Sequence, residues 1–298
     1  MLTHAVESYL SLRHACGFDL KSAGKLLRSF AVFAEARGKH RVCSQTAIEW
    51  AGLARSVNQR ARRLGQVIRF ARYVRAEDPS HEVPPPVFGS EQYVRRTPYI
   101  FSPHGIGQLL QAAAESSPPF RRQTYRTLFA LLACTGLRVS EAIRLLLKDI
   151  TPDGILIRTS KFRKSRLVPL HQTARAGLTR YLKHRLPYAP FDDHVFVSLR
   201  RKPLLIGDVE KTFRLAVEEI GLQQRPRPTP HSLRHTFAVR ALEASPDGRD
   251  HIAEHMVALS TYLGHSSVFY TYWYLEATPE LMEGIARRAE SFVTGGQP

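Results

Sequence analysis

A proline-rich stretch, residues 77–103, constrains the fold of this chain more than any other feature. It reads EDPSHEVPPPVFGSEQYVRRTPYIFSP and lacks the apolar periodicity of a helix or a strand. Apolar residues recur at helical spacing on both sides of it, and 298 residues are enough for two hydrophobic cores. We therefore predict a first domain over residues 1–85, a linker over 86–99 and a second domain over 100–298.

The charge of the chain indicates a polyanionic partner. Lysine and arginine total 43 against 26 acidic residues, which gives a net charge of +17, and nucleic acid is the most common partner of such a protein. No run approaches the about 18 apolar residues of a membrane helix, and the N-terminus lacks the apolar core of a signal peptide. We expect a cytoplasmic protein with no membrane partner. Its scattered cysteines, Cys16, Cys43 and Cys134, are expected to be buried thiols in a reducing compartment.

The first domain is expected to be helical throughout, with segments over 2–17 and 21–37, a third after Ser44, and a fourth over 56–75. In the fourth segment the apolar residues recur every three or four positions and predict a buried stripe of Val57, Ala61, Leu64, Ile68, Ala71 and Val74. Polar residues recur in the same way on another face, which consists of Arg55, Gln59, Arg62, Gln66, Arg69 and Tyr73. No acidic residue interrupts this segment, which favours phosphate contact over a solvated face. We predict that Arg55, Arg62 and Arg69 bind DNA.

The second domain is expected to begin with a helix that has Ser102 as its N-cap and Pro103 at its first position. Further helices are predicted over 104–114, 121–134 and 138–147. Two short apolar runs, GILIRTS and RLVPL, flank the basic turn KFRKS and predict an antiparallel hairpin. VFVSL is a candidate for another short strand. The fold class is therefore mainly α, with a small antiparallel β-sheet in the second domain.

Four segments of the second domain carry residues suited to chemistry. They are CTGLRVSEAIRL (residues 134–145), SKFRKSRLVPL (160–170), TPHSLRHTFA (229–238) and STYLGHSSVFYTYWYLEATPEL (260–281). Taken singly, each also has an ordinary interpretation, such as an arginine at a helix start, a solvated basic turn or an aromatic core helix. The basic turn would place Lys161, Arg163 and Lys164 within reach of a nucleic-acid groove.

In this order, the four segments resemble the tyrosine recombinase/integrase family. The matching elements are Thr135-Gly-Leu-Arg-Val-Ser-Glu141, the hairpin lysine, His231-x-x-Arg234, Leu263-Gly-His265-Ser266, and a tyrosine nine residues after that histidine. The resemblance covers about residues 100–280 and adds a helical N-terminal domain of the expected size. It implies a helical, SAM-like DNA-binding domain and an α-rich catalytic domain that together form a C-shaped clamp on double-stranded DNA.

The resemblance also implies an activity. Such enzymes are site-specific recombinases in which a tyrosine oxygen attacks a phosphodiester, leaving a 3′-phosphotyrosyl bond and a free 5′-hydroxyl. Strand exchange then passes through a Holliday junction. The covalent bond conserves the energy of the phosphodiester, so neither ATP nor a metal or other cofactor is expected. The implied biological role is integration, excision or transposition of a mobile element.

Residue by residue, the resemblance makes Tyr274 the nucleophile, with Tyr272 as the second choice because it lies two positions out of register. Arg138 and Arg234 match the two arginines that hold and neutralise the phosphate. His231 matches the residue that helps to activate the phenol, whose ordinary pKa is about 10.

The remaining assignments concern the leaving group and the support of the site. Lys161 matches the lysine that protonates the departing 5′-oxygen, and Lys164 is the alternative if the hairpin is shifted. His265 is expected to donate a hydrogen bond to the phosphate, and Glu141 to orient neighbouring groups. Arg163 and Lys164 are expected to bind DNA.

Family members often dock their last helix on a neighbouring subunit, and residues 278–293 can form such a helix. The partners implied are therefore double-stranded DNA and further copies of the chain, as a tetramer at synapsis, or related recombinases. The expected location is the bacterial cytoplasm, at the nucleoid. The C-terminal aromatics other than the nucleophile, namely Tyr262, Phe269, Tyr270 and Trp273, are expected to fill the core.

Three alternatives compete with this interpretation. HIAEH, residues 251–255, has the H-x-x-E-H pattern of some zinc proteases, in which His251 and His255 bind zinc and Glu254 acts as base. A pattern this short also arises by chance, and no third ligand can be identified. The other two alternatives are a DNA-binding protein that no longer cuts, and a type IB topoisomerase with similar chemistry.

Overall fold

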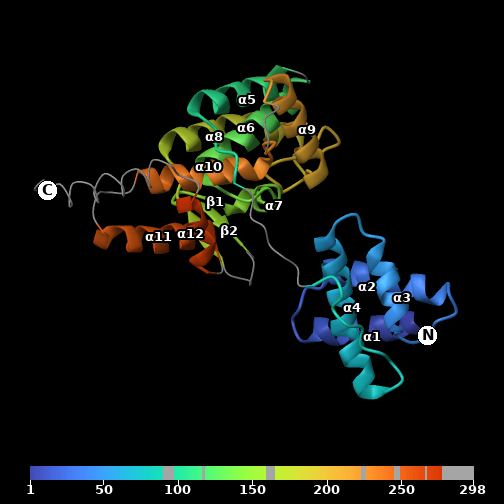
Figure 1. Cartoon of the computed structure of the whole chain (residues 1–298). Helices are drawn as coiled ribbons and strands as arrows, with labels where there is room; N and C mark the ends of the chain where they lie inside the picture. The colour runs from blue at the N-terminus through green and yellow to red at the C-terminus, as the bar shows by residue number, and fades with distance from the viewer. Residues whose placement is uncertain are drawn as a thin grey trace, which may run out of the picture. The chain divides into compact units, whose positions relative to one another are not determined.

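In the computed structural model the chain divides into two compact units, Met1–Arg95 and Arg96–Pro298 (Figure 1). The division falls within residues 86–99. The structure describes residues 1–89, 97–115, 118–158, 165–222, 226–244, 249–265 and 267–276. Among these, no helix combines the length and the apolar character needed to span a membrane.

The first unit is a four-helix domain, as the periodicity predicts. Its helices are α1 (Leu2–Ala15), α2 (Lys21–Glu35), α3 (Ser44–Gly52) and α4 (Val57–Glu77). They enclose one core in which Phe30, Trp50 and Phe70 are the largest side chains. The side chain of Ser56 caps α4, since its Oγ accepts a hydrogen bond from the Gln59 amide at 3.3 Å.

The two faces of α4 differ as expected, with one exception. Most of the predicted stripe is buried, and Val67 and Phe70 join it, but Val57 is 62% exposed. Val57 lies in the first turn of the helix, before the stripe meets the core. On the other face Arg55, Arg62 and Arg69 are exposed.

The second unit contains the helices α5 (Pro103–Glu115), α6 (Pro119–Thr135), α7 (Val139–Ala142), α8 (Gln172–Tyr188), α9 (Ile206–Glu219), α10 (Pro230–Glu243), α11 (Arg249–Leu263) and α12 (Phe269–Glu276). A short 3₁₀ helix spans Leu147–Asp149. The predicted N-cap is confirmed, because Ser102 Oγ accepts a hydrogen bond from the Gly105 amide at 3.0 Å. The mainly helical class is also confirmed.

A three-stranded antiparallel sheet completes the second unit, with the strands in the order β1 (Ile150–Thr151), β2 (Gly154–Ile157) and β3 (Arg166–Val168). The predicted hairpin is therefore present as β2 and β3, with Ile155 opposite Val168. The two-residue strand β1 is too short to give a period-two signal, so the sequence pattern did not reveal it.

Two predictions of local structure were wrong. The helix expected over 138–147 ends after one turn, because the Leu145 carbonyl and the Leu147 amide pair with the backbone of residues 193–195 instead of continuing the helix. The segment VFVSL forms no ladder strand; Val197 makes only an isolated bridge with Pro203.

The predicted burial of the cysteines was wrong as well. Cys16 and Cys134 are exposed and Cys43 is half-buried, and all three are free thiols. They lie at or beside helix ends, where less of the surrounding chain covers them.

Two apolar clusters organise the second unit. The larger one surrounds α6 and includes Phe101, Phe129 and Phe213. The smaller one joins α10, α11 and α12 and includes Leu263 and Tyr274. In Figure 1, α10 lies between α6 and the α11–α12 pair, and it packs against all three. This arrangement brings the ends of α6 and α11 and the inner face of α12 to one place.

Candidate active site

Two arginines tie the ends of three helices together at this place. Arg234, on α10, is 1% exposed, and it donates hydrogen bonds to the carbonyl oxygens of Gly136 at 2.6 Å and Leu263 at 2.7 Å. Arg138, the N-cap residue of α7, donates to the Gly264 carbonyl at 3.1 Å. Burial lowers the pKa of Arg234 to about 10, and the positive charge of the nearby Arg138 adds to this effect. The protein therefore holds two like charges together, an arrangement that favours an anion between them.

The glycines that accept these hydrogen bonds cannot be exchanged freely. Gly136 follows α6 with a φ of +61°, and Gly264 follows α11 with a φ of +65°. A Cβ atom at Gly136 would lie 2.5 Å from the Phe237 ring, and one at Gly264 would lie 2.7 Å from Arg166. Only glycine combines this left-handed backbone with such close neighbours.

Glu141 joins Arg138 to a third arginine. Its buried carboxylate accepts a hydrogen bond from Arg138 Nη1 at 2.8 Å and two from Arg166, at 3.1 and 2.8 Å. Burial alone would raise the pKa of Glu141, but the hydrogen bonds from Arg166 and from the Arg138 backbone outweigh it and lower the pKa to about 2. The carboxylate is therefore ionised at neutral pH and fixes both arginines.

Arg166 is a site residue that the sequence reasoning missed. It lies at the start of β3, and its Nε also donates to the Tyr262 carbonyl at 2.7 Å. The alternation of inward and outward side chains along a β-strand is the sequence signal that could have identified it. Arg166 shares a face with the buried Val168, so its side chain points inward.

Two histidines contact Tyr274, and a third contacts one of them. His231 and His235 are one turn apart on α10, with ring centroids 4.5 Å apart. His235 Nδ1 is 3.3 Å from the Tyr274 hydroxyl. The His265 ring stacks on the Tyr274 ring at 6.2 Å and is fixed by a 2.8 Å hydrogen bond between its Nδ1 and Thr271 Oγ1.

These histidines are neutral in the free protein. Burial, followed by the positive charges of Arg234 and Arg138, lowers the pKa of His231 to about 4 and that of His265 to about 3. His231 is nonetheless an exposed residue, in contrast to its buried neighbour Arg234. Burial also lowers the pKa of His235 to about 3, with His231 and Arg234 adding to the effect.

The tyrosines of α12 differ sharply in burial. Tyr274 is 2% exposed and packs on the inner face of the helix beside the fully buried Thr271. Tyr272 is 52% exposed. The core-filling prediction was wrong for Phe269 and Tyr270, which are 67% and 47% exposed, because only the face with Thr271 and Tyr274 meets α10.

The other aromatic predictions had mixed outcomes. Tyr262 packs as predicted, stacked on Phe237 at 5.4 Å. Trp273 is half-buried against His235.

The predicted hairpin residues Lys161, Arg163 and Lys164 lie outside the described residues, as do Ser266 and the predicted last helix over 278–293. The structure therefore brings together Arg138, Glu141, His231, Arg234, His265 and Tyr274.

The side chain of His251, the first residue of the zinc pattern, lies outside the described part of the structure. Residues 251–255 lie on α11, where Glu254 is exposed and His255 Nε2 is 2.7 Å from the Ala241 carbonyl oxygen. Within the described parts of the chain, no three His, Cys, Asp or Glu side chains are grouped so that they could hold a metal ion.

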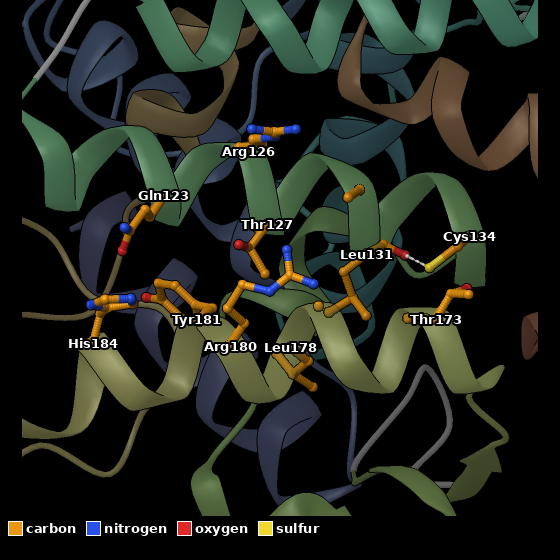
Figure 2. A pocket seen from close by; sticks show the side chains of 13 residues that line it. Gln123, Arg126, Thr127, Leu131, Cys134, Thr173, Leu178, Arg180, Tyr181 and His184 are labelled. Carbon is orange, nitrogen blue, oxygen red and sulfur yellow. Dashed lines mark hydrogen bonds between the residues drawn. The ribbon is translucent and has the colours of Figure 1, made fainter.

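A separate pocket of about 340 Å³ lies between α6 and α8 (Figure 2). Arg126, Arg180 and His184 line it together with apolar and small side chains, and Cys134 lies at one end. The neighbouring atoms that displace water from the Cys134 thiol raise its pKa to about 11, although the residue as a whole is exposed. None of the predicted site residues lines this pocket.

Comparisons with known proteins agree on one family. The model of the phage integrase family matches residues 100–280. The chain is 36% identical to the putative integrase/recombinase y4rB of Sinorhizobium fredii, over 96% of each chain. It is 33% identical to y4rE of the same organism, over 99% of this chain and 97% of that one. Among solved structures, it resembles the Tn1549 transposon integrase in complex with transposon right end DNA, with a TM-score of 0.67, 18% identity and coverage of 96% and 98%.

Proposed function

The chain belongs to the phage integrase family of tyrosine recombinases, which act on DNA, and from this premise we propose that it is a site-specific recombinase with Tyr274 as its nucleophile. One observation carries the proposal. The only α12 tyrosine with a buried side chain among those described is also the one that lies 3.3 Å from a histidine and beside the paired arginines. The same position follows from the family spacing.

The cleavage step has the following balance. Tyr274 Oη attacks the phosphorus of a DNA phosphodiester and loses its proton, a Tyr–O–P bond forms, and the bond from phosphorus to the 5′-oxygen breaks. The products are a 3′-phosphotyrosyl bond and a 5′-hydroxyl, which takes up a proton. Rejoining is the reverse attack by a 5′-hydroxyl of the partner duplex, and two such exchanges pass through a Holliday junction.

Arg138 and Arg234 are proposed to hold the non-bridging oxygens, where charge grows in the transition state. Glu141 and Arg166 keep Arg138 in place through their buried ion pairs. A bound phosphate adds negative charge beside the histidines and therefore raises the pKa of His231, which makes it a better proton acceptor for the Tyr274 phenol.

Two further roles complete the chemistry. His265, held by Thr271, is proposed to donate a hydrogen bond from its Nε2–H group to the phosphate. Lys161, at the hairpin tip, is proposed as the acid that protonates the 5′-oxygen, with Lys164 as the alternative. The family chemistry requires no metal, since the arginines and the lysine supply the positive charge.

DNA binding is proposed to involve the exposed arginines of the first unit. Arg55, Arg62 and Arg69 lie on or beside α4 in a stretch without acidic residues, and they are proposed to contact phosphates in a sequence-independent way. Arg163 and Lys164 are proposed to contribute from the hairpin. Copies of the chain, or related recombinases, are proposed to assemble on DNA as a tetramer at synapsis.

The biological role is proposed to be the integration, excision or transposition of a mobile element in the bacterial cytoplasm. The structural similarity to a transposon integrase and the sequence similarity to y4rB and y4rE support this role.

Trapping the covalent intermediate tests the proposal. The protein is expressed in its source cells, and covalent protein–DNA complexes are recovered under denaturing conditions and sequenced to the attached 3′ ends. We expect reproducible junctions with the natural protein and none with Tyr274→Phe, whereas Tyr272→Phe, the matched control on the exposed face, should give the same junctions as the natural protein. The absence of junctions from the natural protein would contradict an active recombinase.

A strand-joining assay with duplexes built from the mapped junction then distinguishes a recombinase from a topoisomerase. A recombinase joins the strands of two duplexes, whereas a type IB topoisomerase only relaxes supercoils in one.

A further inference from the structure

His235 is a half-buried histidine to which the chemistry above gives no role. It follows Arg234 on α10 and lies one helical turn after His231, so both histidines share a face of the helix. Its Nδ1 is 3.3 Å from the Tyr274 hydroxyl oxygen. That oxygen is the atom proposed to attack the phosphate.

The imidazole of His235 is held from both helices that meet at the site. The Trp273 ring meets it edge-on at a centroid distance of 5.0 Å, and the His231 ring meets it edge-on at 4.5 Å. The Tyr274 ring itself lies at 5.5 Å. Packing on several sides leaves the ring little rotational freedom, so the direction of Nδ1 is set before DNA arrives.

We propose that His235 is a positioning residue, whose Nδ1 accepts a hydrogen bond from the Tyr274 hydroxyl and fixes the direction of its oxygen for attack. The inference rests on the proposed function, since it takes Tyr274 as the nucleophile. It goes beyond that function because it gives the site a third histidine, whose task is geometric.

The protonation of His235 in the free protein agrees with this task. With a pKa of about 3, the ring is neutral and offers one nitrogen as an acceptor. The Tyr274 hydroxyl can therefore donate a hydrogen bond to Nδ1 before DNA arrives.

The hydrogen bond is expected to affect the alignment of the attacking oxygen and therefore the cleavage rate. A displacement of about 1 Å in a reacting group can lower a rate by on the order of a hundredfold. Loss of the hydrogen bond frees the hydroxyl while the aromatic packing of α10 and α12 remains. The expected cost therefore falls on the cleavage rate and leaves DNA affinity unchanged.

A pair of matched substitutions separates positioning from packing. His235→Phe keeps an aromatic ring against Trp273 but removes the acceptor. His235→Asn loses the ring but places an amide oxygen or nitrogen near the position of Nδ1. Single-turnover formation of the covalent complex is measured on a nicked duplex built from the mapped junction, and DNA affinity is measured by gel shift.

We expect His235→Phe to cleave about 10- to 100-fold more slowly than the natural protein with DNA affinity within about twofold, and His235→Asn to recover most of the lost rate. The proposal is overturned if His235→Phe cleaves at the natural rate, or if His235→Asn binds DNA normally and is as slow as His235→Phe. If the natural protein forms no covalent complex, the proposed function fails instead.

A second measurement does not depend on activity. Imidazole ¹⁵N NMR spectra of the whole chain are compared between the natural protein and Tyr274→Phe, with His235→Asn used for assignment. We expect the Nδ1 signal of His235 to shift when the Tyr274 hydroxyl is removed. An unchanged signal would overturn the proposal.

Discussion

Replacing Glu141 with glutamine tests how much its ion pairs with Arg138 and Arg166 stabilise the protein. The side chain keeps its shape, but its negative charge between Arg138 and Arg166 is lost. In the folded protein the pKa of Glu141 is about 2, against its ordinary 4.5. At about 1.4 kcal/mol for each tenfold change in an equilibrium constant, this difference corresponds to about 3 kcal/mol of stability at pH 7. The side chain is 5% exposed, so solvent screens little of this contribution.

The pH dependence has a definite sign. A carboxylate whose folded-state pKa is depressed contributes fully above its unfolded pKa, and the contribution disappears as the pH falls from about 4.5 to about 2. The stability difference between the natural protein and Glu141→Gln is therefore expected to fall from about 3 kcal/mol at pH 7 to about 1.4 kcal/mol at pH 3. Other titrating groups are common to both proteins and cancel in this difference.

The chain offers a convenient probe for this experiment. It has two tryptophans, Trp50 in the first unit and Trp273 in the second. In a Trp50→Phe background, the fluorescence of Trp273 follows urea unfolding of the second unit alone. A destabilisation below about 1 kcal/mol at pH 7, or one that stays constant down to pH 3, would refute the electrostatic account of Glu141.

Five further substitutions have expected outcomes. Gly136→Ala should destabilise the second unit by several kcal/mol, on the order of 3, because its Cβ would lie 2.5 Å from a phenylalanine ring at a φ of +61°. Gly65→Ala is the control, since its Cβ meets nothing within 4 Å, and urea unfolding should show it to be about 0.5–1 kcal/mol more stable. Arg201→Gly should stabilise the second unit by about 1 kcal/mol in the same assay, because Arg201 has a left-handed φ of 57°; a loss of stability would contradict this. Arg62→Ala and Arg69→Ala should each weaken DNA binding in gel shifts. Each should also reduce the slope of log affinity against log salt concentration by about one, as expected for the loss of one phosphate contact. An unchanged slope would exclude phosphate contact.

The helical frame could be predicted because each helix carries its own periodic signal. The starts of α2 and α3 and the N-cap Ser102 follow directly from local sequence. The α7 prediction was wrong because its outcome depends on backbone pairing between Leu147 and Asp193, which are distant in sequence. Contacts of this kind leave no trace in a local pattern.

The site was predictable in part for a different reason. Family spacing identified Arg138, Arg234 and Tyr274, and the structure places them together. The family spacing does not include Arg166, which contacts Glu141 only because strand β3 is brought beside α7 in the folded protein. Periodicity likewise could not tell which face of α12 meets α10, so Phe269 was assigned to the core although it is exposed.

Identification of the residue that carries the DNA tests the central claim most directly. The trapped covalent complex is digested with nuclease and protease, and the peptide with a nucleotide remnant is fragmented in a mass spectrometer. The account predicts that the remnant is attached to Tyr274. Attachment to Tyr272, or to any other residue, would contradict it.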